Sequence, residues 1–171
     1  MIHVYFGNGK GKTTAAVGLA TRCAGHGKHV IFAQFLKSRD TGEIVSLIKL
    51  GIHVIRSEKT DCFSWEMNKE QKEECKKVQA GLFDIIVSDV QNKNLIDMLV
   101  LDEALNALSE GFLDEKELKD FIISKSEDME IVLTGRVLPD WLKEMADYCT
   151  EMKKHKHPYD KGTQAREAVE Y

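Results

Sequence analysis

Residues 2–14, IHVYFGNGKGKTT, decide how this chain folds, because an apolar strand pattern runs directly into a glycine-rich turn. A Lys-Thr-Thr run and a helical pattern follow the turn. This layout is typical of a phosphate-binding loop, in which glycines let backbone N–H groups surround phosphate oxygens. The positive end of the following helix faces the same oxygens. In such a loop Lys12 reaches the outer phosphates and the Thr13 hydroxyl ligates Mg²⁺.

The loop is one residue shorter than the usual motif, which has four residues between its glycines. Only Asn8, Gly9 and Lys10 separate Gly7 from Gly11, and Lys10 is an additional lysine. The pattern therefore predicts that the loop binds nucleotide phosphates, but it does not fix the reaction.

The bulk composition describes one ordinary globular domain, residues 1–171. Apolar residues make up 43% and charged residues 30%, and the net charge is −4. This charge argues against general affinity for nucleic acid or anionic membranes, and no apolar run approaches the roughly 20 residues that span a bilayer. The four cysteines, Cys23, Cys62, Cys75 and Cys149, form no C-x-x-C pair. Free thiols and a cytoplasmic location are therefore expected.

Strand-like and helix-like segments alternate along the whole chain. Continuous apolar strands in such an alternation predict an α/β fold, with a mainly parallel sheet of about six strands and helices on both faces. The P-loop makes a nucleotide-binding fold of the recombinase-like type the expected architecture. Strands are expected at 2–6, 29–35, 52–57, 95–103, 129–136 and 148–153, and helices at 13–24, 42–51, 68–90, 114–126 and 139–147.

Polar side chains follow three of these strands, where ligands bind in parallel sheets. Besides the P-loop, these are Asp102 with Glu103 and the Thr134-Gly135-Arg136 run, so a single site is expected at this edge. An apolar run ending in Asp is the usual second half of a P-loop Mg²⁺ site, and Glu103 is placed to position a second group. The alternative is two acids that cap a helix. Arg136 is either a phosphate clamp or the partner of a surface salt bridge.

Two further patterns allow a functional and an ordinary interpretation. Phe63 and Trp65 stand in a polar loop, either as an anchor on the core or as a wall for a large planar ligand. The His155-x-His157 pair has a spacing that a metal can use, but without nearby Cys or acidic partners it fits solvated or backbone-bonding histidines better.

Together, seven short motifs resemble the P-loop class of ATP:corrinoid adenosyltransferases. Their order and spacing fit the family from residue 2 to the end, and the shortened loop, F-x-W-E and TGR are the specific ones. The motifs are GNGKGKTTAA at the start, GHGK at 25–28, QFLK at 34–37, F-x-W-E at 63–66, VLDEALNAL at 100–108, LTGR at 133–136 and KHPYDKG at 156–162.

The resemblance implies an enzyme that moves the 5′-deoxyadenosyl group of ATP onto the Co(I) of a corrinoid, either cobalamin or cobyrinic acid a,c-diamide. Triphosphate leaves intact, so the loop holds a leaving group. Catalytic roles fall on Lys12, Glu103 and Arg136, and Mg²⁺ support falls on Thr13 and Asp102. Triphosphate binding is carried over to Gly7, Asn8, Gly9, Lys10, Gly11, Lys12, Thr13 and Thr14.

In the family, the pair matching Phe63 and Trp65 lies against the corrin face and favours four-coordinate Co(II), which is easier to reduce. The resemblance further implies a homodimer and an electron-donating reductase such as a flavodoxin. The sequence departs from the family pattern at Cys62 and Val137, where glycine is common, and we expect no counterpart of the helix that precedes the first strand in some relatives.

Two other functions remain open from the residues themselves. One is a P-loop kinase or ATPase that transfers phosphoryl groups in the same site. The other is an ATP-gated binding module related to recombinase-like domains, which the acidic composition disfavours.

Overall fold

The protein is built around one six-stranded sheet in which every pairing is parallel. The computed structural model describes residues 1–37, 41–57, 67–92 and 95–169. Strand order is β3-β2-β4-β5-β1-β6, so the P-loop strand β1 lies between β5 and the edge strand β6. The strands are β1 (Ile2–Phe6), β2 (Val30–Gln34), β3 (His53–Arg56), β4 (Met98–Asp102), β5 (Glu130–Thr134) and β6 (Tyr148–Glu151).

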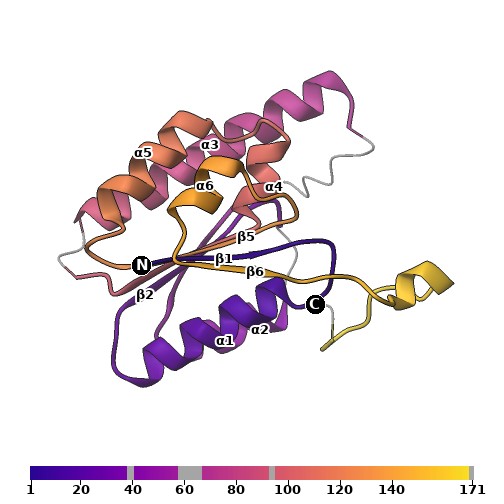
Figure 1. Ribbon diagram of the computed structural model, residues 1–171, viewed down its shortest axis with the longest axis horizontal. Helices are drawn as coiled ribbons and strands as arrows, with labels where there is room; N and C mark the ends of the chain where they lie inside the picture. Colours follow the sequence, from indigo (N-terminus) through magenta and orange to yellow (C-terminus); the bar gives the residue numbers. More distant parts are fainter. Residues whose placement is uncertain (38–40, 58–66, 93–94, 170–171) are drawn as a thin grey trace.

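Helices cover both faces of the sheet (Figure 1). One face carries α1 (Lys12–Gly25) and α2 (Gly42–Lys49). The other carries α3 (Lys69–Asn92), α4 (Ala104–Ser109), α5 (Glu115–Lys125) and α6 (Asp140–Met145). A short 3₁₀ helix, η2 (Pro158–Lys161), follows β6, and the C-terminal end of the chain returns to the start of α1 (Figure 1).

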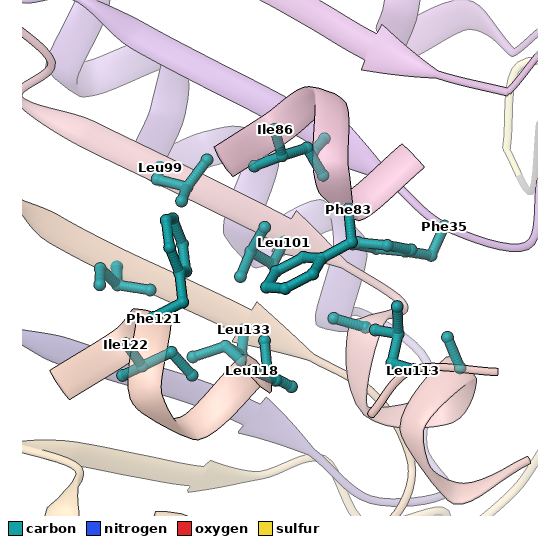
Figure 2. Packing of buried hydrophobic residues seen from close by; sticks show 14 of the residues in the cluster. Phe35, Phe83, Ile86, Leu99, Leu101, Leu113, Leu118, Phe121, Ile122 and Leu133 are labelled. Atoms are coloured by element: carbon teal, nitrogen blue, oxygen red, sulfur yellow. The ribbon is translucent and has the colours of Figure 1, made fainter. Parts of the chain in front are cut away.

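The alternation of side chains along each strand gives the protein two hydrophobic cores. On β2, Phe32 packs under α1 and α2, whereas its neighbours Ile31 and Ala33 face α3 and α5. In the larger core Phe83 and Phe121 meet edge to face, with ring centroids 5.5 Å apart (Figure 2). A sheet buried on both faces has its ligand sites at the strand ends, which is where the polar residues of this chain gather.

The expected α/β fold is confirmed, and most elements lie within a few residues of their predicted bounds. The capping box that opens α3 is present, because Asn68 Oδ1 accepts from Gln71 N at 2.9 Å and Gln71 Oε1 accepts from Asn68 N at 2.9 Å. Asp114 likewise caps α5, accepting from Glu117 N at 2.9 Å.

Four expectations about the ordinary structure need correction or addition. Pro139 is the N-cap of α6 and not its first residue. Helix α4 was not expected, because its short apolar run directly follows the acids at the end of β4. The C-terminal tail, expected to be irregular, contains η2. Cys23 and Cys149 are free, but buried Cys75 is disulfide-bonded. The expectation of free thiols was wrong for Cys75, because sequence spacing does not reveal which cysteines the fold brings together. No helix in the described ranges is long and apolar enough to cross a membrane.

Candidate active site at the carboxyl ends of the strands

The P-loop runs between two glycines with positive φ and is closed by its own lysine. Gly7 and Gly11 have φ of 106° and 113°, a region that residues with a Cβ rarely adopt. Lys12 Nζ donates to the carbonyl oxygens of Gly7 at 2.9 Å and Gly9 at 2.8 Å. Burial lowers the pKa of Lys12. The carboxylates of Glu103 and Asp102 would raise this pKa, whereas the positive charge of Arg136 lowers it further. The loop therefore holds its ammonium over the turn where phosphates bind.

Strands on both sides of β1 support the loop. Gly7 N donates to the Arg136 carbonyl at 3.1 Å, and Gly9 N donates to the Met152 carbonyl at 2.5 Å. Asn8 Oδ1 accepts from Lys154 N at 2.9 Å. The ends of β5 and β6 thus fix the short loop from two directions.

Asp102 is the fully buried centre of the polar cluster. Its Oδ1 accepts from the hydroxyls of Thr13 at 2.9 Å and Thr134 at 2.7 Å. Its Oδ2 accepts from Gln34 Nε2 at 3.0 Å and from Lys37 Nζ at 3.4 Å. These donors compensate the cost of burying a carboxylate and connect β4 to α1, β5 and β2.

Glu103 follows in a left-handed conformation, with φ of 61°, and caps α4. Its backbone N–H donates to Thr134 Oγ1 at 2.8 Å, and its Oε2 accepts a short hydrogen bond from Asn106 Nδ2. Burial and the neighbouring charge of Asp102 raise the pKa of Glu103. Asn106 Oδ1 also accepts from Arg136 N at 2.7 Å, so one amide aligns the ends of β4 and β5.

A pocket of about 360 Å³ opens beside these groups, and residues 9–14 form one of its walls. The rest of the lining comes from Val17, Lys37, Gly42, Glu43, Glu103, Ala168 and Val169. Lys10 Nζ donates to the Val169 carbonyl at 3.0 Å. The pocket contains apolar and charged surface, as a site for a nucleotide requires.

The structure brings the predicted strand-end groups together at one edge of the sheet, as expected. The backbone of Arg136 contacts the P-loop, although its side chain does not line the pocket. His157 Nδ1 accepts from Tyr159 N at 3.2 Å, which confirms the backbone-bonding interpretation of that histidine. Phe63 and Trp65 lie outside the described residues, so their expected role stays a prediction.

Sequence reasoning did not assign Gln34, Met152 or Asn106 to the site. Gln34 and Lys37 follow from the rule applied to Asp102, since they stand at the carboxyl end of β2. Asn106 lies one helical turn after Glu103. Met152 contributes a backbone carbonyl, for which the sequence carries no signal.

The oxygen-rich donor set around Thr13 fits Mg²⁺, which prefers hard oxygen ligands and keeps several waters. The Thr13 hydroxyl and the Asp102 carboxylate are in direct contact. Gln34 Oε1 beside them is a buried acceptor with no hydrogen-bond partner within the described part of the chain. An acceptor of this kind suits a metal-bound water.

Comparison with known proteins agrees with this geometry. The family model described as ATP:corrinoid adenosyltransferase BtuR/CobO/CobP matches residues 1–171. The corrinoid adenosyltransferase of Escherichia coli strain K12 is 30% identical over all of this chain and 85% of its own length. The corrinoid adenosyltransferase CobA of Salmonella typhimurium strain LT2 is 32% identical with the same coverage, and that of Pseudomonas aeruginosa strain PAO1 is 31% identical over 98% of this chain and 82% of its own. The chain therefore belongs to the ATP:corrinoid adenosyltransferase family.

Proposed function

We propose that this chain moves the 5′-deoxyadenosyl group of ATP onto the cobalt of a corrinoid in the strand-end site and releases inorganic triphosphate. The observation that carries the proposal is the P-loop joined directly to Asp102 through the Thr13 hydroxyl, in a chain that matches the family from end to end. The corrinoid is cobalamin or cobyrinic acid a,c-diamide, and its Co(I) form supplies the nucleophile.

In this reaction the P-loop binds a leaving group. Backbone N–H groups of residues 8 and 10–14, together with the side chains of Lys10 and Lys12, hold the triphosphate and stabilise the charge that it gains as the bond to C5′ breaks. Nothing in this scheme requires a residue that activates water at the outer phosphate. The loop therefore needs positive charge and fixed geometry, which agrees with its extra lysine and its support from β5 and β6.

Thr13 and Asp102 hold Mg²⁺ in this proposal, and Glu103 positions the nucleotide. When bound, the ion neutralises part of the triphosphate charge. Arg136 adds positive charge at the same edge, as its effect on the pKa of Lys12 indicates. The remaining polar contacts, from Gln34, Thr134 and Asn106, keep the two acids in place.

Three further parts of the proposal come from the family resemblance. Phe63 and Trp65 lie against the corrin face, a reductase such as a flavodoxin delivers the electron that makes Co(I), and the enzyme works as a cytoplasmic homodimer. Light scattering of the purified chain tests the dimer, since a monomeric mass at working concentration contradicts it.

Product analysis tests the reaction against the phosphoryl-transfer alternative. The chain is incubated with ATP, Mg²⁺ and chemically reduced cobalamin, and the products are separated. Adenosyl transfer predicts one inorganic triphosphate for each light-sensitive cobalt–carbon product. ADP and phosphate in place of triphosphate identify a kinase or ATPase. Tight, salt-sensitive binding to DNA supports the recombinase-like module instead.

Replacing Lys12 tests the role of the loop. Lys12→Ala removes the ammonium that spans the Gly7 and Gly9 carbonyls, and we expect turnover to fall by at least about 100-fold because the triphosphate is no longer held. Lys49→Ala, at the exposed end of α2, is the control. Near-normal turnover of Lys12→Ala would exclude the loop from the mechanism.

A further inference from the structure

Lys37 stands where the chain leaves the carboxyl end of β2 and reaches the pocket. Its ammonium nitrogen is 3.4 Å from Asp102 Oδ2 and 3.9 Å from Glu103 Oε1, and its side chain is only 29% exposed. The pocket lining therefore includes a lysine whose ammonium pairs with the two carboxylates that follow one another at the end of β4.

The backbone around Lys37 is held in an unusual conformation. Lys37 N donates to the Phe35 carbonyl at 2.8 Å, which closes a tight turn around Leu36, whose φ is 62°. A positive φ is unfavourable for a residue with a branched side chain, so the surroundings must maintain it. Backbone strain of this kind occurs where a side chain has to be placed for function.

Two contacts maintain the turn. Phe35 N donates to the Asp102 carbonyl at 2.9 Å, and Leu36 N donates to Gln79 Oε1 at 3.0 Å. Gln79 belongs to α3 and is fully buried. It is a polar residue on the buried side of this helix, where the other buried residues are apolar. The buried Gln79 amide thus fixes the residue that precedes Lys37. The turn is bonded both to α3, through Gln79, and to the end of β4, through the Asp102 carbonyl.

We propose that Lys37 is a phosphate-binding residue of this site, with its ammonium positioned by Asp102 and Glu103 and its backbone positioned by Gln79. The inference rests on the proposed function, in which the pocket holds the triphosphate of ATP. Lys37 adds a third lysine to the lining of this pocket, together with Lys10 and Lys12. The alternative is a structural ion pair, in which Lys37 only neutralises the two acids.

Binding of inorganic triphosphate in the presence of Mg²⁺ measures this role, by isothermal titration calorimetry of the full chain. Lys37→Met should weaken binding about tenfold or more, because a hydrogen bond to a charged group is lost. Lys37→Arg keeps the charge and should remain within about threefold of the original affinity. Lys49→Met, a matched exposed lysine, should leave the affinity unchanged. Unchanged binding by Lys37→Met overturns the proposal.

The same titration separates failure of this inference from failure of the proposed function. If Lys12→Ala binds triphosphate normally, the P-loop does not hold triphosphate and the proposed function fails. If Lys12→Ala loses binding while Lys37→Met keeps it, only the role of Lys37 is wrong.

A structure of the complex with Mg²⁺ and triphosphate distinguishes a phosphate contact from a structural ion pair. The proposal requires Lys37 Nζ within hydrogen-bond distance of a phosphate oxygen, and an ammonium that contacts only the two acids contradicts it.

Gln79 is tested as a positioning residue by a double-mutant cycle. Gln79→Met removes the acceptor for Leu36 N at similar volume and should weaken triphosphate binding several-fold. In the Lys37→Met background the same change should cause no further loss, because Gln79 acts through Lys37. Additive losses would assign Gln79 to general stability.

Discussion

At the scale of single residues, the site depends on polar groups that satisfy one another inside an apolar sheet. Asp102 is fully buried, and its two carboxylate oxygens receive four donors from different elements. The Thr134 hydroxyl forms two hydrogen bonds, because it donates to the Asp102 carboxylate and accepts from Glu103 N. Removing one member of such a network leaves its buried partners without a hydrogen bond, which costs more than the bond itself contributes.

Replacing Thr134 by valine tests this network at constant shape. Thr134→Val removes a donor to Asp102 and the acceptor for Glu103 N, so we expect the free energy of unfolding to fall by about 1–3 kcal/mol. Turnover should fall as well, because the two acids lose their alignment. Thr150→Val, on the exposed edge strand β6, is the matched control and should change stability little. Chemical denaturation measures both, and equal stability of the two variants would contradict the network.

A second residue-scale prediction concerns Asp97, just before the amino end of β4 and away from the site. It accepts from Lys28 Nζ at 2.9 Å and from His29 N at 2.8 Å. The hydrogen bond from Lys28, then that from His29, lowers the pKa of Asp97 below its ordinary 3.8. A carboxylate whose pKa is lower in the folded than in the unfolded state stabilises the fold at pH values above its unfolded pKa. That contribution is lost as the pH falls through the folded pKa.

Asp97→Asn should therefore melt at a lower temperature than the original chain at neutral pH. The difference should shrink as the pH falls through and below 3.8. Thermal melts across this pH range measure the effect. Asp120→Asn, which removes the exposed pair with Lys116 on α5, serves as the control and should change little. A difference that grows at low pH would have the wrong sign for this assignment.

At the scale of elements, the sequence predicted which segments form strands and helices better than it predicted how the P-loop is supported. Asp102 was identifiable because it ends an apolar run of strand length, and Thr13 because it follows the lysine of the P-loop motif. The contacts from Met152 and Lys154 were not, because they use backbone groups of these two residues, which lie more than a hundred residues from the loop in the sequence. The sequence showed the unusual shortness of the loop and predicted a strand at 148–153, but it did not show that the end of this strand supports the loop.

Gly9 shows how closely the loop and β6 fit. A Cβ on Gly9 would lie 2.6 Å from the Met152 carbonyl oxygen and 2.9 Å from the Lys153 carbonyl carbon, which are backbone atoms with little room to move. Gly9→Ala should therefore displace the loop, and we expect triphosphate affinity to fall about tenfold or more.

Gly18→Ala is the control for Gly9→Ala, because a Cβ there meets nothing within 4 Å. That change should keep triphosphate affinity and stabilise α1 by about 0.5–1 kcal/mol. Calorimetric titration and thermal melts together measure both variants. Normal binding by Gly9→Ala would show that the loop does not depend on its contact with β6.

At the scale of the whole molecule, the parallel sheet gathers residues far apart in sequence at one edge, and this general rule made the site predictable. Alternating apolar strands and helices were sufficient for the fold, because two-sided burial leaves few other arrangements. The tail escaped prediction, since the approach of Val169 to Lys10 follows from no periodic pattern. Strand β3 ends at Arg56 at the same edge of the sheet, and Phe63 and Trp65 follow this strand in the sequence.

Trp65→Ala tests whether that stretch serves the corrinoid. If the aromatic pair favours four-coordinate Co(II), turnover that starts from Co(II) with a reductant should fall at least about tenfold, because the reduction becomes harder. Turnover from chemically supplied Co(I) should stay within about threefold, since the adenosyl-transfer step does not use the pair. The two assays share every other step, so each serves as the control for the other. Equal losses in both assays would assign Trp65 to packing, and the proposed role of the aromatic pair in the reduction of Co(II) would then be wrong.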